Sequence, residues 1–179
     1  RSQLHDHLAS VHADELEGTF RTNKDDADLI WLLIHTGLRL EEALMLKWNA
    51  VDFNNETFTV FDTKNSRDHT LPMTENTKIM LTRRVKDHGI FVFPSPIHPD
   101  RSMTASKTFK RVSEEVGFVF TAHDLRRTVA TVAAERGYDL SSVGAVLNHS
   151  RQGVTDGYIQ KTIPRLKQIL NDIENELFL

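Results

Sequence analysis

Six residues of this chain have the side-chain types that a metal-free phosphoryl transfer requires. They are two arginines, two histidines, a lysine and a tyrosine: Arg39, Lys64, His123, Arg126, His149 and Tyr158. The transition state of this reaction concentrates negative charge on the non-bridging oxygens, which planar guanidinium groups bind with paired donors. A tyrosine can attack the phosphorus once its proton is withdrawn or nearby cations stabilise its phenolate. This chemistry needs no cluster of metal ligands.

The lysine and the two histidines could move the protons of such a reaction. A lysine in an electropositive pocket can have a lowered pKa, which suits it to protonate a departing sugar oxygen. Histidine titrates near neutral pH and can act as a base or as a hydrogen-bond donor. The complete set therefore predicts that a tyrosine attacks a phosphodiester held by two guanidinium groups.

Taken singly, each of these residues also has an ordinary structural explanation. Arg39 could pair with Glu42 beyond a helix end, and Lys64 could be a solvated lysine at a hairpin tip. His149 could favour a helix C-terminus, where positive charge is stabilised. Tyr158 could be half-buried with its hydroxyl satisfied. His123 and Arg126, three positions apart, could form a network in the first turn of a helix.

The local sequences around these residues are more specific than the residue types. Residues 36–44 read TGLRLEEAL, residues 123–128 read HDLRRT, and residues 147–150 read LNHS. Tyr158 follows His149 by nine positions. With Lys64 in a turn-like segment, these sequences resemble in content and order the motifs of the tyrosine recombinase, or phage integrase, family. The resemblance extends from Thr36 to Tyr158 and implies a catalytic domain of that family.

The resemblance implies how the phosphate is held. Arg39 and Arg126 look like the two residues that bind the scissile phosphate. His149 looks like the donor to a non-bridging oxygen. Glu42 resembles the acidic residue that follows the first arginine and supports it.

The resemblance also implies how the bond is broken and remade. Tyr158 looks like the nucleophile that forms a 3′-phosphotyrosyl bond, and His123 looks like the histidine that helps to deprotonate it. Lys64 looks like the hairpin lysine that protonates the departing 5′-oxygen, although Lys47 and Lys78 are close in sequence. Because the covalent bond keeps the energy of the phosphodiester, rejoining needs no ATP, and no cofactor is expected.

Asn148 departs from the family pattern, in which glycine usually occupies this position. A left-handed backbone would tolerate asparagine there, since asparagine adopts this conformation better than most residues. The placement of His149 depends on this residue.

The composition is that of a soluble globular protein, with 39% hydrophobic and 26% charged residues and no cysteine. The net charge is -3, which alone would not indicate a nucleic-acid partner. The charge is uneven, however, because residues 62–127 carry 12 basic and 8 acidic side chains. Phosphate contacts depend on a local basic surface, so this segment is compatible with DNA. Without an apolar run of about 18 residues, we expect a cytoplasmic protein. The family resemblance implies that it comes from a bacterium, phage or mobile element.

The elements that position these residues are mostly helical. Three short β-branched or aromatic stretches, at 51–53, 57–61 and 69–72, predict a small antiparallel sheet. Helices are predicted at 25–35, 40–47, from Thr74 or Glu75 to 87, and at 104–116, 123–136, 140–147 and 164–177. The expected fold class is α+β, as in the catalytic domains of tyrosine recombinases.

Residues 1–20 are expected to be a linker remnant or a short helix, and residues 21–179 the catalytic domain. The resemblance implies that a separate N-terminal DNA-binding domain is absent from this fragment. It also implies double-stranded DNA as the partner and a homo-tetramer on DNA, with a monomer possible for the isolated fragment. The apolar face of the last helix could pack on its own domain or on a neighbouring subunit; it comprises Leu166, Ile169, Leu170, Ile173 and Leu177.

Three alternatives remain open at this point. A type IB topoisomerase would use similar chemistry without exchange between two sites. A catalytically inactive DNA-binding module could keep the fold alone. The polar residues near the start of the chain, His5, Asp6, His7 and His12, could suggest a metal site, but their spacing matches no ligand motif well and a coincidental cluster is expected.

Overall fold

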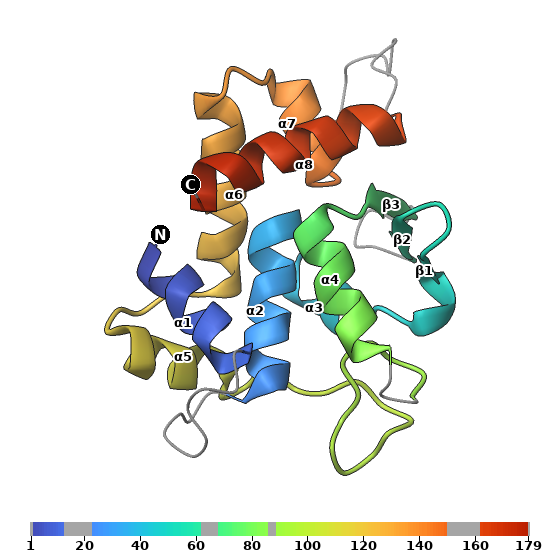
Figure 1. Cartoon of the computed structure of the whole chain (residues 1–179), viewed down its shortest axis with the longest axis vertical. Helices are drawn as coiled ribbons and strands as arrows, with labels where there is room; N and C mark the ends of the chain where they lie inside the picture. The colour runs from blue at the N-terminus through green and yellow to red at the C-terminus, as the bar shows by residue number, and fades with distance from the viewer. Residues whose placement is uncertain (1, 13–22, 62–67, 86–88, 150–161, 179) are drawn as a thin grey trace.

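The fold was analysed in a computed structural model, which describes residues 2–12, 23–61, 68–85, 89–149 and 162–178 (Figure 1). A small sheet lies to one side of a helical body (Figure 1). The helices are α1 (Ser2–His12), α2 (Lys24–Thr36), α3 (Leu40–Leu44), α4 (Glu75–Arg84), α5 (Thr108–Val116), α6 (Ala122–Glu135), α7 (Leu140–Val146) and α8 (Ile163–Phe178), with a 3-10 turn, η1 (Trp48–Ala50). The predicted fold class is confirmed.

The three strands form an antiparallel sheet in the order β1 (Val51–Asp52), β2 (Thr57–Val60) and β3 (His69–Pro72). Val60 pairs with His69 at the end of the β2–β3 hairpin. The predicted strand positions are confirmed, although β1 and β2 each end one residue earlier than expected. The connecting residues 62–67, and with them Lys64, lie outside the described residues.

Helix α2 is the centre of the core and packs against α1, α3, α4, α5, α6 and α8. Its predicted apolar block, residues 29–34, is buried apart from the partly exposed Trp31. The side chain of Asn23 accepts a hydrogen bond from the backbone of Asp26 and so caps its start. Gly37 ends it in a left-handed conformation with φ of 68°. Because α2 is covered on so many sides, its two ends are fixed relative to the whole body.

Three predicted helix boundaries were wrong by three residues or more. The helix expected to reach residue 87 ends at Arg84, and the other two boundaries differ for local reasons. The helix expected from residue 104 begins at Thr108, because the preceding chain is extended and the Met103 amide donates to the Phe93 carbonyl. The helix expected to reach residue 47 ends at Leu44. There the chain turns to lie beside residues 90–92, where the Val92 amide donates to the Leu46 carbonyl.

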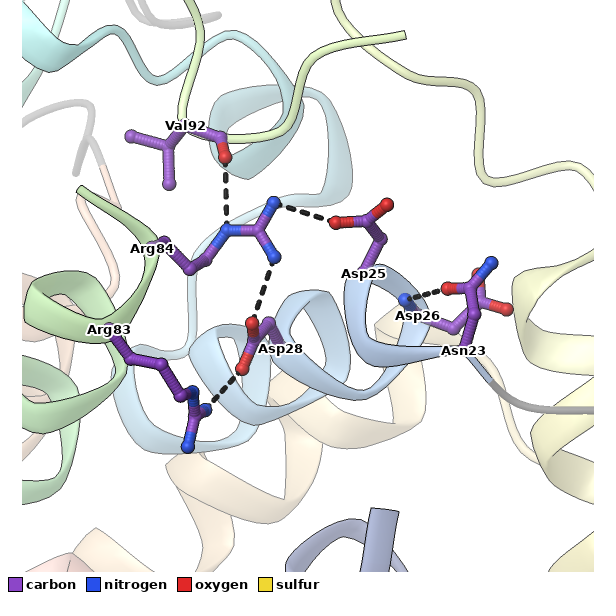
Figure 2. Close-up of polar contacts among 7 residues, drawn as sticks. All are labelled: Asn23, Asp25, Asp26, Asp28, Arg83, Arg84 and Val92. Carbon is purple, nitrogen blue, oxygen red and sulfur yellow. Dashed lines mark hydrogen bonds and ion pairs between the residues drawn. The ribbon is translucent and has the colours of Figure 1, made fainter. Parts of the chain in front are cut away.

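Buried ion pairs join the start of α2 to α4 (Figure 2). Asp28 accepts hydrogen bonds from Arg83 at 2.6 Å and from Arg84 at 2.8 Å. Arg84 also donates to Asp25 and to the Val92 carbonyl, so each of its three guanidinium nitrogens donates a hydrogen bond (Figure 2). Burying a charge is costly unless it is paired and hydrogen-bonded, and this network meets both conditions.

A second buried carboxylate joins the start of α2 to α5. Asp26 is fully buried and accepts two hydrogen bonds of 2.7 Å from the Arg111 guanidinium. The Thr108 hydroxyl donates to the same carboxylate at 2.5 Å. The first turn of α2 is therefore held from two directions by cations on different helices.

The apolar face predicted for the last helix packs on its own domain. Leu166, Ile169, Leu170, Ile173 and Leu177 are all buried. Helix α8 contacts α6, α7, α2, α1 and β3, and it crosses α6 near the chain end (Figure 1). Of the two placements left open by the sequence, this chain adopts the intramolecular one. No described helix is long and apolar enough to cross a membrane.

We predict unequal effects of replacing two adjacent arginines of α4. Arg84→Met should lower the free energy of unfolding by roughly 3–5 kcal/mol, because it leaves the buried Asp28 without one of its cations. Arg83→Met should cost about 1 kcal/mol or less, because the Arg83 side chain is 40% exposed and Arg84 still binds Asp28. Urea unfolding measures both, and equal losses would contradict this account of the network.

Candidate active site

Arg39 lies immediately beyond the end of α2 and is the N-cap residue of α3. Its backbone amide donates to Glu42 at 2.9 Å, and its guanidinium Nη1 donates to the same carboxylate at 2.7 Å. Glu42 is buried, whereas the Arg39 side chain is 28% exposed. The carboxylate therefore fixes both the backbone and the side chain of Arg39, while part of the guanidinium stays accessible.

Arg126, on the second turn of α6, joins two distant segments through backbone carbonyls. Its Nη1 donates to the Gly37 carbonyl and its Nη2 to the Leu147 carbonyl, each at 2.5 Å. Burial, followed by the positive charge of Arg39, lowers the pKa of Arg126 to about 10. Arg126 is still protonated at neutral pH, and both bonded acceptors are neutral groups. Two guanidinium groups thus lie close enough to repel each other, which favours an anion between them.

Gly37 allows these segments to approach closely. Besides its left-handed backbone, a Cβ atom at this position would lie 2.6 Å from Leu147 Cδ2 and 3.0 Å from Val129 Cγ1. Neither distance is compatible with a side chain unless the neighbours move. Glycine is required here both for the turn after α2 and for its contact with α6 and the segment after α7.

His149 follows the end of α7 and joins the same group of residues. Asn148 has φ of 51°, so the left-handed backbone that would tolerate asparagine is present. The His149 amide donates to the Gly144 carbonyl at 2.9 Å, which directs the chain back toward the helix. Partial desolvation and then the charges of Arg126 and Arg39 lower the pKa of His149, against an opposing effect of Glu42. The imidazole therefore lies within the field of both arginines.

The other predicted site residues are placed less completely. His123 is exposed on the first turn of α6, one turn before Arg126. The Thr121 and Asp124 side chains form a capping box that fixes this turn. Lys64 and Tyr158 lie outside the described residues. The structure thus brings together Arg39, Glu42, Arg126 and His149, and it leaves the remaining roles as predictions.

Two lysines that competed with Lys64 in the sequence are described. Lys78 Nζ donates to Glu56 at 2.6 Å, and Lys167 of α8 binds the same carboxylate. Lys78 and Lys167 together lower the pKa of Glu56 to about 2. Lys47 lies over the Phe91 ring, with Nζ 5.5 Å from its centroid. Both candidates therefore have structural contacts of their own.

The histidine-rich start of the chain packs as part of the body. The His5 ring lies 5.3 Å from the Trp31 ring and 4.6 Å from the Phe178 ring. Within the described part of the chain, no three histidine, cysteine, aspartate or glutamate residues are grouped so that they could hold a metal ion.

One residue near the candidate site was not singled out in the sequence. His69 begins β3, is buried, and has its Nε2 2.9 Å from the Val146 carbonyl. Its only sequence signal is a histidine at the start of a short strand. Its partner is 77 positions away, so the pattern of residues could not have revealed the contact.

The chain belongs to the phage integrase family, whose sequence profile matches residues 10–164. It is 30% identical to tyrosine recombinase XerA of Pyrococcus furiosus over 161 residues, which cover 84% of this chain and 56% of XerA. It is 31% identical to prophage integrase IntA of Escherichia coli over 127 residues, covering 67% of this chain and 30% of IntA. The chain spans about half the length of the first of these curated relatives.

Solved structures support the same fold. The integrase of mycobacterium phage Brujita has a TM-score of 0.66 and 24% sequence identity, with 96% of this chain and 62% of that chain covered. The XerH site-specific recombinase bound to difH substrate has a TM-score of 0.65 and 21% identity, with 83% of this chain and 46% of that chain covered. At these identities the likeness concerns the fold alone.

We predict that Arg39→Gln raises the pKa of His149. The substitution removes a cation that disfavours the imidazolium and releases Glu42, whose charge favours it. Titration of the assigned imidazole resonances by NMR measures the change. Arg127→Gln is the matched control, because Arg127 is exposed at the position next to Arg126. An unchanged His149 pKa in Arg39→Gln would show that the two groups are not coupled.

Proposed function

We propose that this chain is the catalytic domain of a site-specific DNA recombinase that cleaves and rejoins DNA through a covalent bond to Tyr158. The observation that carries the proposal is the convergence of Arg39, Arg126 and His149 from three separate segments. Two of these groups are permanent cations, and the contacts of Arg126 do not neutralise it. Such an arrangement suits an anion that gains charge in the transition state.

In this proposal Arg39 and Arg126 bind the non-bridging oxygens of the scissile phosphate. Glu42 orients Arg39 and does not react, since its carboxylate is already occupied by the Arg39 backbone and side chain. His149 donates a hydrogen bond to a phosphate oxygen. Its lowered pKa means that it is mostly neutral in the free protein at neutral pH. A neutral imidazole still donates through one ring nitrogen, and a bound phosphate would counteract the two arginines and favour the imidazolium, in which both nitrogens donate.

The bond-breaking steps are assigned to His123 of α6 and to Lys64 and Tyr158, which lie outside the described residues. The Tyr158 oxygen attacks phosphorus, with His123 helping to remove its proton, and Lys64 protonates the departing 5′-oxygen. The 3′-phosphotyrosyl bond conserves the energy of the phosphodiester, so the reverse attack by a 5′-hydroxyl rejoins a strand without ATP. The cationic side chains supply the charge that a metal would otherwise provide.

The named relatives support the choice of DNA as partner. The XerH structure is a pre-cleavage complex with its difH substrate, and a Tn1549 transposon integrase structure contains circular intermediate DNA. Both share the fold of this chain. We propose double-stranded DNA as the substrate, a tetramer on the recombining sites, and the cytoplasm of a bacterial or phage-carrying cell as the location.

We predict that the protein forms an SDS-resistant adduct with a nicked suicide substrate carrying its recombination site. Tyr158→Phe should abolish the adduct, because the phenyl ring has no oxygen to attack phosphorus. Tyr138→Phe is the control: it is the other of the two tyrosines, and its hydroxyl donates to Asp172, so it should keep the adduct. The adduct of the wild type should also form in EDTA, and gel electrophoresis measures all four reactions.

Two outcomes would favour the alternative functions. DNA binding by a folded wild-type protein without any adduct would indicate an inactive binding module. Adduct formation with relaxation of supercoiled plasmid, but without exchange between paired sites, would indicate a topoisomerase-like activity.

We predict that Arg126→Ala and Arg39→Ala each slow adduct formation by an amount equivalent to roughly 3–4 kcal/mol, the loss expected for a missing oxyanion donor. Single-turnover cleavage at saturating protein separates this effect from DNA affinity. Arg127→Ala removes an exposed arginine of the same helix and should mainly weaken binding in a salt-dependent way. Cleavage at the normal rate in either of the first two variants would refute the proposed phosphate contacts.

A further inference from the structure

The last carbonyls of α7 are bound by side chains from two different elements. A helix leaves its final carbonyls without intrahelical donors, so they need other partners. The Val146 carbonyl lies 2.9 Å from His69 Nε2 of β3, and the next carbonyl, of Leu147, accepts from Arg126 of α6. These two consecutive carbonyls directly precede Asn148 and His149. The backbone that leads to His149 is therefore held by His69 of the sheet and by Arg126 of α6.

The state of the His69 ring follows from its partner. A backbone carbonyl only accepts hydrogen bonds, so Nε2 must carry a proton and act as the donor. His69 is buried, with 7% of its surface exposed. Without this bond, a buried polar atom on each side would lose a partner, at a cost larger than the net gain of an ordinary hydrogen bond. The contact thus favours a single relative position of β3 and the end of α7.

The same histidine also closes the hairpin. Val60 and His69 are partners in the β2–β3 ladder, so residues 61–68, which include Lys64, connect the two strands beyond this pair. A shift of His69 along or away from the ladder would move the base of that hairpin. One side chain therefore connects the hairpin that carries Lys64 with the segment that carries His149.

We propose that His69 is a positioning residue that holds the His149 segment and the base of the Lys64 hairpin in a fixed relation. This inference rests on the proposed function for its catalytic consequence. Its structural part, the placement of His149 against Arg39 and Arg126, does not require any activity. His69 does not touch the reacting atoms in this proposal and acts through Val146 and the strand.

The test compares three substitutions on β3 under conditions where urea unfolding shows each variant to be folded. His69→Leu removes the donor. His69→Gln keeps an N–H donor at a similar reach from the backbone. Thr70→Val, the matched control, removes the 2.8 Å hydrogen bond between the Thr70 and Thr59 hydroxyls in the same ladder without touching α7.

The first measurement is the NMR titration of His149, which is independent of catalysis. In His69→Leu we expect the pKa of His149 to rise towards its ordinary value, because the imidazole is freed to leave the field of the two arginines. His69→Gln and Thr70→Val should leave it near the wild-type value. The proposal is overturned if His69→Leu leaves it unchanged, or if Thr70→Val shifts it equally.

The second measurement is single-turnover cleavage of the suicide substrate. His69→Leu should slow adduct formation by up to about 100-fold with little change in DNA affinity, as expected for misplaced reacting groups. His69→Gln should recover most of the rate, and Thr70→Val should react at nearly the wild-type rate. Equal slowing of His69→Leu and Thr70→Val would contradict the proposal, because it would show that His69 only stabilises the sheet. An absence of adduct in the wild type would refute the proposed function, and the His149 titration would still decide the structural part.

Discussion

The two hydrogen bonds from Arg126 to the carbonyls of Gly37 and Leu147 are the interaction on which the candidate site depends. They bring the end of α2 and the end of α7 to one guanidinium, and these two segments carry Arg39 and His149. Carbonyl dipoles stabilise the buried cation without cancelling its charge. A carboxylate in their place would bind Arg126 more strongly, but it would also neutralise the group that is proposed to meet a phosphate. The contacts hold the arginine in place and preserve its charge.

The rest of the body keeps this arrangement from relaxing. Repulsion between Arg39 and Arg126 would separate the segments that carry them if either segment were free to move. Contacts outside the site hold both segments in place. The start of α2 is bound through Asp26 to α5. It is also bound through Asp28 to α4 (Figure 2). At its other end Gly37 packs against Leu147 without space for a side chain. The favourable energy of these remote contacts offsets the unfavourable proximity of two cations.

The sequence predicted the helices and strands that carry this site better than it predicted the buried contacts that hold them in place. Periodicity and capping signals located the helices, and Asn148 has the left-handed backbone that the sequence named as the condition for tolerating asparagine there. The polar residues at the start of α2 give no sequence signal of burial, yet Asp26 and Asp28 are buried there. Their partners are more than 50 residues later in the chain, as the 55-residue separation of Arg83 from Asp28 shows. Composition cannot reveal which distant cation meets which carboxylate, and the same limit hid the role of His69.

The position of α8 shows how polar contacts can specify a helix that apolar packing alone would leave loosely defined. Its buried Glu174 accepts hydrogen bonds from Thr74, from Asn76 and from His35 Nδ1, the last at 2.6 Å. Burial outweighs this carboxylate contact and lowers the pKa of His35, so the imidazole is neutral and donates through Nδ1. An apolar face can slide by a turn at little cost, whereas this carboxylate would lose three donors. Any other docking place for α8 must therefore supply an equivalent set of donors around Glu174, and a groove of matching shape without them would not hold the helix in register.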